Sequence, residues 1–283
     1  MSDAIEDSNL GRVKQLIGHG FDRSKALDMA LSAYPTDDDF KPNRAIVGYL
    51  LSDGADPNYV GYSGFSAMSS LASVIKFDPI VANMLLQHRG HIDAHALYNA
   101  AWRPEAKTHL VALQWMVTHH VDVNMLSPET GQTALFGAVI GDNPDCVAFL
   151  IEHGAKTDVV ARDGRTPLMD AVINHEESAI SVAAARVLLD DGADPNKRGP
   201  GGMTALMYLA HLKDVVEENG RIDSGYADTT DEAVGVFLAK VLIAHGAKVG
   251  LKDMYGHTAA QLASKHGLRR LADYLNSSAA FGR

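Results

Sequence analysis

The chain has few aromatic residues, one cysteine and no long apolar run. Aromatic residues make up 7% of its 283 residues, and Cys146 stands alone, which excludes a disulfide within the chain and favours a reducing compartment. No apolar run approaches the ~18–20 residues that a membrane-spanning helix needs. Residues 1–7 are acidic and contain no apolar segment, so we expect no signal peptide, no membrane contact and a cytoplasmic protein.

Basic residues are also fewer than acidic residues. Lysine and arginine number 25 against 35 aspartate and glutamate residues, a formal net charge of −10 at pH 7. Such a chain is repelled by phosphate backbones, so direct binding to nucleic acid is disfavoured. The imbalance mildly favours a partner protein with a basic surface. The alternative explanation is that the negative charge only keeps the protein soluble.

The motifs of common active sites are missing as well. The chain has no C-x-x-C, H-E-x-x-H or G-x-x-x-x-G-K-[ST] pattern. His88, His91 and His95 have a suggestive spacing for a metal, but they fall at a helix end, in a loop and at a helix start. Cys146 lies where a helix begins, and the helix dipole there lowers a thiol pKa, so a thiol nucleophile is the catalytic alternative. We expect no metal, no cofactor and no catalysis.

What the chain does contain is one pattern repeated, best seen in residues 131–158. Thr133 precedes an apolar run and is expected to cap a short helix through its hydroxyl group. Val147 and Leu150 share one face of a second short helix, and Gly154 suits the left-handed position after it. Neither helix is long enough to be stable alone. Each pair must therefore bury its apolar side against a neighbouring pair.

Copies of this unit recur in phase along the chain. Gly-Gln-Thr-Ala-Leu at 131–135 is matched by Gly-Arg-Thr-Pro-Leu at 164–168, and Gly-Ala-Asp-Pro-Asn occurs at 54–58 and at 192–196. These motifs resemble the ankyrin repeat, whose pattern is roughly G-x-T-P-L-x-x-A, a turn, V-x-x-L-L and then G-A-x-x-N. The resemblance implies an all-α solenoid of stacked helix-turn-helix units with short β-hairpin-like fingers.

We expect the units to form a single domain over residues 1–276 with about seven to eight repeats. The fourth unit, from Ala94, has no finger before its first helix, and His120 stands where the family has glycine. Gly192 and Gly246 are 54 residues apart against a family period of about 33, so about twenty residues are inserted there, either as a binding element or as a tolerated surface loop. The expected parts are an N-terminal cap at 3–23, the insertion at 211–232, a C-terminal cap at 251–276 and a flexible tail at 277–283.

The resemblance also implies a function. Ankyrin arrays bind proteins through a concave surface made of fingertips and first helices, so we expect a non-catalytic adaptor or inhibitor that is a monomer on its own. The alternative is an acidic effector that occupies the basic surface of a nucleic-acid-handling protein. Position matching gives as partner-binding candidates Tyr62, Phe65, Tyr98, Trp102, Arg103, Gln132, Phe136, Arg162, Arg165, Asn174, Met203, Tyr208, His211, Tyr255 and His257.

Three further positions, Ser69, Glu129 and Asp170, fall on the same expected surface. For Trp102, Phe136 and Tyr208, packing between repeats is an equal alternative to partner contact. Aromatic and arginine side chains often carry much of the energy of an interface.

Overall fold

The structure is a computed structural model that describes residues 1–32, 42–61, 64–73, 76–102, 106–173, 179–210 and 229–281. All regular secondary structure within these ranges is helical, which confirms the all-α prediction. None of the helices described there has the length and apolar content needed to cross a membrane.

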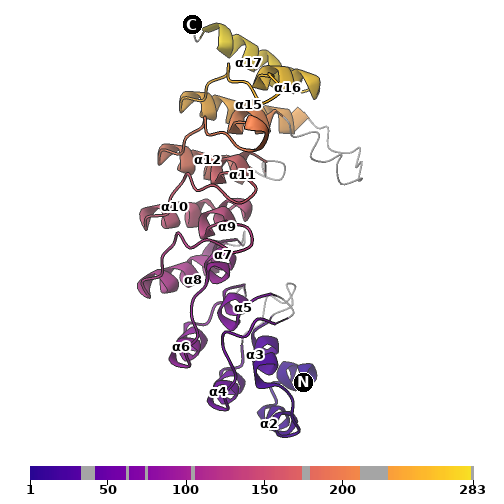
Figure 1. Ribbon diagram of the computed structural model, residues 1–283, viewed down its shortest axis with the longest axis vertical. Helices are drawn as coiled ribbons and strands as arrows, with labels where there is room; N and C mark the ends of the chain where they lie inside the picture. Colours follow the sequence, from indigo (N-terminus) through magenta and orange to yellow (C-terminus); the bar gives the residue numbers. More distant parts are fainter. Residues whose placement is uncertain are drawn as a thin grey trace.

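The helices form two stacked layers, and each repeat contributes one helix to each layer (Figure 1). The first helices are α1 (Ser2–Glu6), α3 (Arg23–Leu31), α5 (Ala67–Ser73), α7 (Ala94–Trp102), α9 (Ala134–Ile140), α11 (Pro167–Ile173), α13 (Ala205–Leu209) and α16 (Ala259–Lys265). The second helices are α2 (Leu10–Gly18), α4 (Arg44–Ser52), α6 (Pro79–Gln87), α8 (Ala106–Thr118), α10 (Pro144–Glu152), α12 (Ala179–Asp190), α15 (Thr229–Ala244) and α17 (Arg269–Phe281). The array is elongated, with the chain termini at opposite ends.

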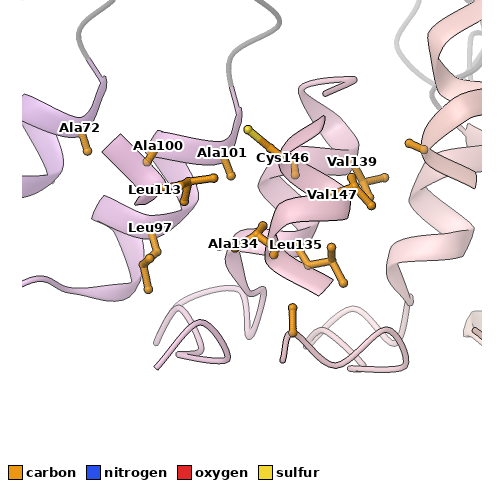
Figure 2. Packing of buried hydrophobic residues seen from close by; sticks show 14 of the residues in the cluster. Ala72, Leu97, Ala100, Ala101, Leu113, Ala134, Leu135, Val139, Cys146 and Val147 are labelled. Atoms are coloured by element: carbon orange, nitrogen blue, oxygen red, sulfur yellow. The ribbon is translucent and has the colours of Figure 1, made fainter. Parts of the chain in front are cut away.

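The core lies between the layers and between successive repeats. Figure 2 shows how small and large side chains alternate there: Ala100 and Leu97 of α7 lie near Leu113 of α8, and Leu135 of α9 lies near Val147 of α10. All five are fully buried. Alanines allow the thin helices to approach, and each buried leucine or valine contributes roughly 1.5–3 kcal/mol. The predicted helix-on-helix stacking is therefore the main source of stability.

Polar side chains and glycines define the helix ends. Asn143 caps α10 by accepting a hydrogen bond from the Cys146 backbone N–H at 3.1 Å. Gly154 has φ 88° after α10, and the Ala155 N–H closes the helix end on the Leu150 carbonyl oxygen at 2.9 Å. The glycine prediction at this position is confirmed.

Two helix-end details differ from the simple pattern. Thr133 is the N-cap residue of α9 but makes no side-chain cap bond, and its Oγ1 atom is buried without a hydrogen-bond partner among the described residues. The expected hydroxyl cap is therefore wrong. His120 adopts φ 57°, the left-handed conformation that glycine supplies elsewhere. The backbone turn is thus kept where the glycine is absent.

Asparagines at the ends of the loops join neighbouring repeats. The Asn124 side chain donates to the Gly154 carbonyl oxygen at 2.9 Å and accepts from the Lys156 N–H at 2.8 Å. Asn58 and Asn196 make the equivalent pair of bonds to the next loops. This explains why the loop pattern ends in asparagine: its amide both donates and accepts.

The fourth repeat enters α7 directly, as expected from its missing finger. Asp93 begins the helix by accepting the Ala96 N–H at 2.8 Å. Its two carboxylate oxygens also accept the hydroxyl groups of Ser66 and Ser69, each at 2.7 Å. One acidic side chain thereby couples the third and fourth repeats without a finger.

Two expected segment limits can be compared with the structure. Helix α17 continues to Phe281, so most of the segment expected to be a tail at 277–283 is helical. Helix α15 begins at Thr229, within the expected insertion at 211–232, whose residues up to 228 lie outside the described ranges. The proposed domain limits otherwise stay predictions.

Candidate protein-interaction face

The fingers are tight turns before the first helices, and four of them follow one another from residue 127 onward. In each finger a backbone hydrogen bond joins the first residue to the last, which suits the hairpin-like shape implied by the resemblance. The closing bonds run from Ser127 N to Gln132 O (2.8 Å), Ala161 N to Arg165 O (2.9 Å), Gly199 N to Met203 O (2.8 Å) and Asp253 N to His257 O (2.9 Å).

Neighbouring fingers are also joined to each other. The Arg162 N–H donates to the Thr130 carbonyl oxygen at 2.8 Å, and the Met254 N–H donates to the Gly201 carbonyl oxygen at 2.8 Å. These bonds fix the spacing between fingertips. We call the surface made by the fingers and the first helices the inner face.

The candidate residues divide by exposure. Tyr255 is 74% exposed and Trp102 47%, and Arg162 is also exposed, so these three are free to touch a partner. The partly buried candidates are Phe65, Tyr98, Gln132, Arg165, Met203, Tyr208 and His257. Tyr62, Arg103, Asn174 and His211 lie outside the described residues.

Phe136 is a correction. Its side chain is completely buried on α9, which packs between α7 and α11. It cannot contact a partner in this state, and packing between repeats, the alternative reading of this residue, is what the structure shows.

Charged side chains meet where the finger at 161–165 approaches α11. The Arg165 guanidinium lies 2.8 Å from Asp163 Oδ2 through Nε and 3.0 Å from Asp170 Oδ1 through a terminal nitrogen. The Asp170 side chain is only 3% exposed. Its contact with Arg165 lacks hydrogen-bond geometry, so neither Asp170 oxygen accepts a hydrogen bond among the described residues. A buried carboxylate in this condition is uncommon.

Two tyrosines from other repeats lie within electrostatic range of this carboxylate. Burial raises the pKa of both Tyr98 and Tyr208, and the charge of Asp170 raises each of them further. Tyr98 reaches over α9 because Gly137 has no side chain: a Cβ atom there would lie 3.2 Å from the Tyr98 ring. We call Tyr98, Asp163, Arg165, Asp170 and Tyr208 the Asp170 cluster.

Asp170 is expected to make stability depend on pH. Burial raises its pKa to about 6, although Arg165 opposes the shift. The folded protein therefore holds this proton more tightly than the unfolded chain, and stability is lost as pH rises from about 4 to 6. Asp170→Asn removes that loss, so relative to the wild type its unfolding free energy should increase by about 2–3 kcal/mol between pH 4 and pH 7.

Urea unfolding at the two pH values measures this difference, with Asp163→Asn as the control. Partial burial raises the pKa of Asp163, but hydrogen bonds from Arg165 outweigh it, and the pKa is lowered. Asp163 therefore contributes stability at neutral pH that is lost as pH falls. Relative to the wild type, the unfolding free energy of Asp163→Asn should decrease between pH 4 and pH 7. Equal pH profiles for wild type and Asp170→Asn would contradict the assignment.

A second contact spans the repeat that has no finger. His95 Nε2 of α7 lies 2.9 Å from Glu129 Oε2 on the next finger, and the Phe65 ring meets the His95 ring edge-on at 5.9 Å. Glu129 and Phe65 were expected on this surface, whereas His95 was missed as part of it. The missing finger was the available signal, since it leaves the first turn of α7 uncovered.

Cys146 does not fit the nucleophile alternative. It is completely buried, and burial, with a smaller effect from Asp145, raises the pKa of its thiol to about 12. The effect of burial on this pKa therefore outweighs that of the helix dipole, on which the nucleophile alternative rested. In the described part of the chain, no three histidine, cysteine or acidic residues are grouped so as to hold a metal ion.

Comparison with known proteins agrees with the stacked architecture. Residues 97–199, which include most of the fourth repeat and most of the Asp170 cluster, match the family of ankyrin repeats in three copies. This part of the chain consists of ankyrin repeats, and the relatives described below include ankyrin-repeat proteins. Ankyrin repeats generally mediate contacts between proteins.

Several relatives share the repeats. Human ankyrin repeat and SOCS box protein 6 is 34% identical over 110 residues, covering 36% of this chain and 24% of that protein. Bovine cyclin-dependent kinase 4 inhibitor B is 28% identical over 155 residues, covering 55% of this chain and 98% of that protein. An ankyrin repeat protein of Fowlpox virus (strain NVSL) is 37% identical over 84 residues, covering 30% of this chain and 25% of its own length. The match thus spans only about a quarter of the human relative.

Proposed function

We propose that this chain is a non-catalytic adaptor or inhibitor that binds a partner protein through its inner face. The observation that carries the proposal is the row of four fingers, joined in part by backbone bonds, with Arg162 and Tyr255 exposed on them. Fingers whose backbones are already fixed lose little conformational entropy on binding, and arginine and aromatic side chains often carry much of the energy of an interface.

The bovine relative supports the inhibitor version of this proposal. Its name gives it as an inhibitor of cyclin-dependent kinase 4, and the alignment covers nearly all of it. Which partner this chain binds is not implied by the likeness.

A second version concerns the charge of the partner. The formal charge of −10 favours a basic partner surface, such as that of a nucleic-acid-handling protein. Partner binding that weakens strongly as salt is raised supports this version, and salt-independent binding to an apolar surface contradicts it.

Affinity capture from an extract of the source cells tests the main proposal. The inner-face variant Trp102→Ala/Arg162→Ala/Tyr255→Ala is compared with a matched variant of exposed second-helix residues, Ile80→Ala/Val111→Ala/Phe237→Ala. A partner held by the wild type should be lost from the inner-face variant, by about tenfold or more in affinity. The second-helix variant should retain it.

Loss from the second-helix variant alone would place the binding surface on the opposite layer and contradict the proposal. A partner retained by both variants would show that Trp102, Arg162 and Tyr255 do not form the binding surface. Thermal melts of both variants show whether each still folds.

A further inference from the structure

We infer that the Asp170 cluster is the seat for a cationic side chain of the partner, arginine in preference to lysine. This inference rests on the proposed inner-face binding and adds the chemistry that the partner must present at this point. The cluster draws on three repeats, since Tyr98 lies on α7, Asp170 on α11 and Tyr208 on α13.

The first argument is the state of the carboxylate. Asp170 is nearly completely buried, and neither of its oxygens accepts a hydrogen bond among the described residues. A buried carboxylate without hydrogen bonds is costly to the folded protein. The Arg165 side chain, which lies against Asp170, is 33% exposed, so the way to the carboxylate from the surface runs beside Arg165. A donor that enters there supplies hydrogen bonds that the carboxylate lacks in the free protein.

The second argument is charge. Asp163 and Asp170 carry two negative charges against the single positive charge of Arg165. One further cation makes the group neutral, whereas an acidic ligand adds to the excess and an apolar ligand leaves the oxygens unpaired. A cationic side chain is therefore the ligand that this cluster fits.

The third argument concerns the tyrosines. Tyr98 and Tyr208 are both close enough for the charge of Asp170 to affect their pKa values. Aromatic faces attract cations, and a planar guanidinium group stacks on them while it donates in two directions to a carboxylate. Arginine uses both features, and the compact ammonium group of lysine uses them less well.

Arg165 has a defined place in this arrangement. Its guanidinium already lies 3.0 Å from Asp170 Oδ1, held from the finger side by Asp163. An incoming arginine must share the carboxylate with it. Removing the Arg165 charge should therefore strengthen binding at this seat, which a purely structural ion pair would not do.

The probe is N-acetyl-L-arginine amide, titrated into the full chain while the ring resonances of Tyr98 and Tyr208 are followed by NMR. N-acetyl-L-citrulline amide is the neutral control of the same shape. For the wild type we expect saturable shifts with a Kd of about 1–50 mM, as suits a single side chain. The citrulline probe should give none.

Two variants decide the assignment. Asp170→Asn should abolish the saturable shifts, and Arg165→Gln should lower the Kd by about threefold to tenfold. Thermal melts establish that both variants fold, and Arg165→Gln keeps the test informative even if Asp170→Asn is perturbed.

Equal shifts from the two probes, unchanged binding by Asp170→Asn, or no saturable binding to the wild type would each overturn the inference. None of these results bears on the capture experiment, which tests the inner face through Trp102, Arg162 and Tyr255. The seat and the general function therefore fail separately.

Discussion

Gly141→Ala is expected to destabilise the protein by at least about 3 kcal/mol. A Cβ atom at Gly141 would lie 1.5 Å from the Trp102 carbonyl oxygen, and that oxygen belongs to the backbone of α7. No rotation of a side chain relieves such a clash. Helices α7 and α9 must move apart, and the core between the fourth and fifth repeats then loses its close packing.

Gly48→Ala is the matched control. Gly48 lies inside α4, and no atom comes within 4 Å of a Cβ placed there. Alanine is the better helix former, so this variant should gain about 0.5–1 kcal/mol. Urea unfolding followed by circular dichroism measures both changes. A cost below about 1 kcal/mol for Gly141→Ala would show that α7 and α9 do not approach this closely.

The separation of α7 and α9 caused by Gly141→Ala should also disturb the inner face. Gly137 lies one turn before Gly141, and a Cβ atom there would lie 2.7 Å from the Tyr98 carbonyl oxygen. Tyr98 owes its position near Asp170 to this contact between backbones. The glycines of α9 therefore have a part both in packing and in assembling the Asp170 cluster.

Most of the fold was predictable because its signals are local. The spacing of Val147 and Leu150 places them on one helix face, and both are fully buried. Gly154 marks the end of the same helix through its own backbone conformation. Each signal extends over a few residues, and repetition along the chain makes it reliable.

The inner face was less predictable because its residues are set by distant neighbours. Phe136 has the position of a surface candidate, yet its side chain is buried because α7 and α9 approach closely. This approach brings Gly141 against Trp102, and these two residues are far apart in sequence. Thr133 looks like a helix cap, but its buried hydroxyl finds no partner among the described residues. The nearness of Tyr98 to Asp170 crosses a whole repeat, which no local pattern encodes.

Leu150→Asp should have a still larger effect, about 4–5 kcal/mol or more. Leu150 is completely buried on α10, which packs between α8 and α12. An aspartate there has no basic partner within the apolar core and must either stay neutral at a cost or carry water inward. Either outcome separates neighbouring repeats, so we expect a partly unfolded protein at neutral pH.

Val111→Asp introduces the same side chain on α8, where the native valine is 42% exposed. It should change the unfolding free energy by no more than about 1 kcal/mol, because the charge stays hydrated. Thermal melts of the two variants give the comparison. If Leu150→Asp melted like Val111→Asp, the apolar face assigned to α10 would be wrong, and with it the register that places every finger and first helix on the inner face.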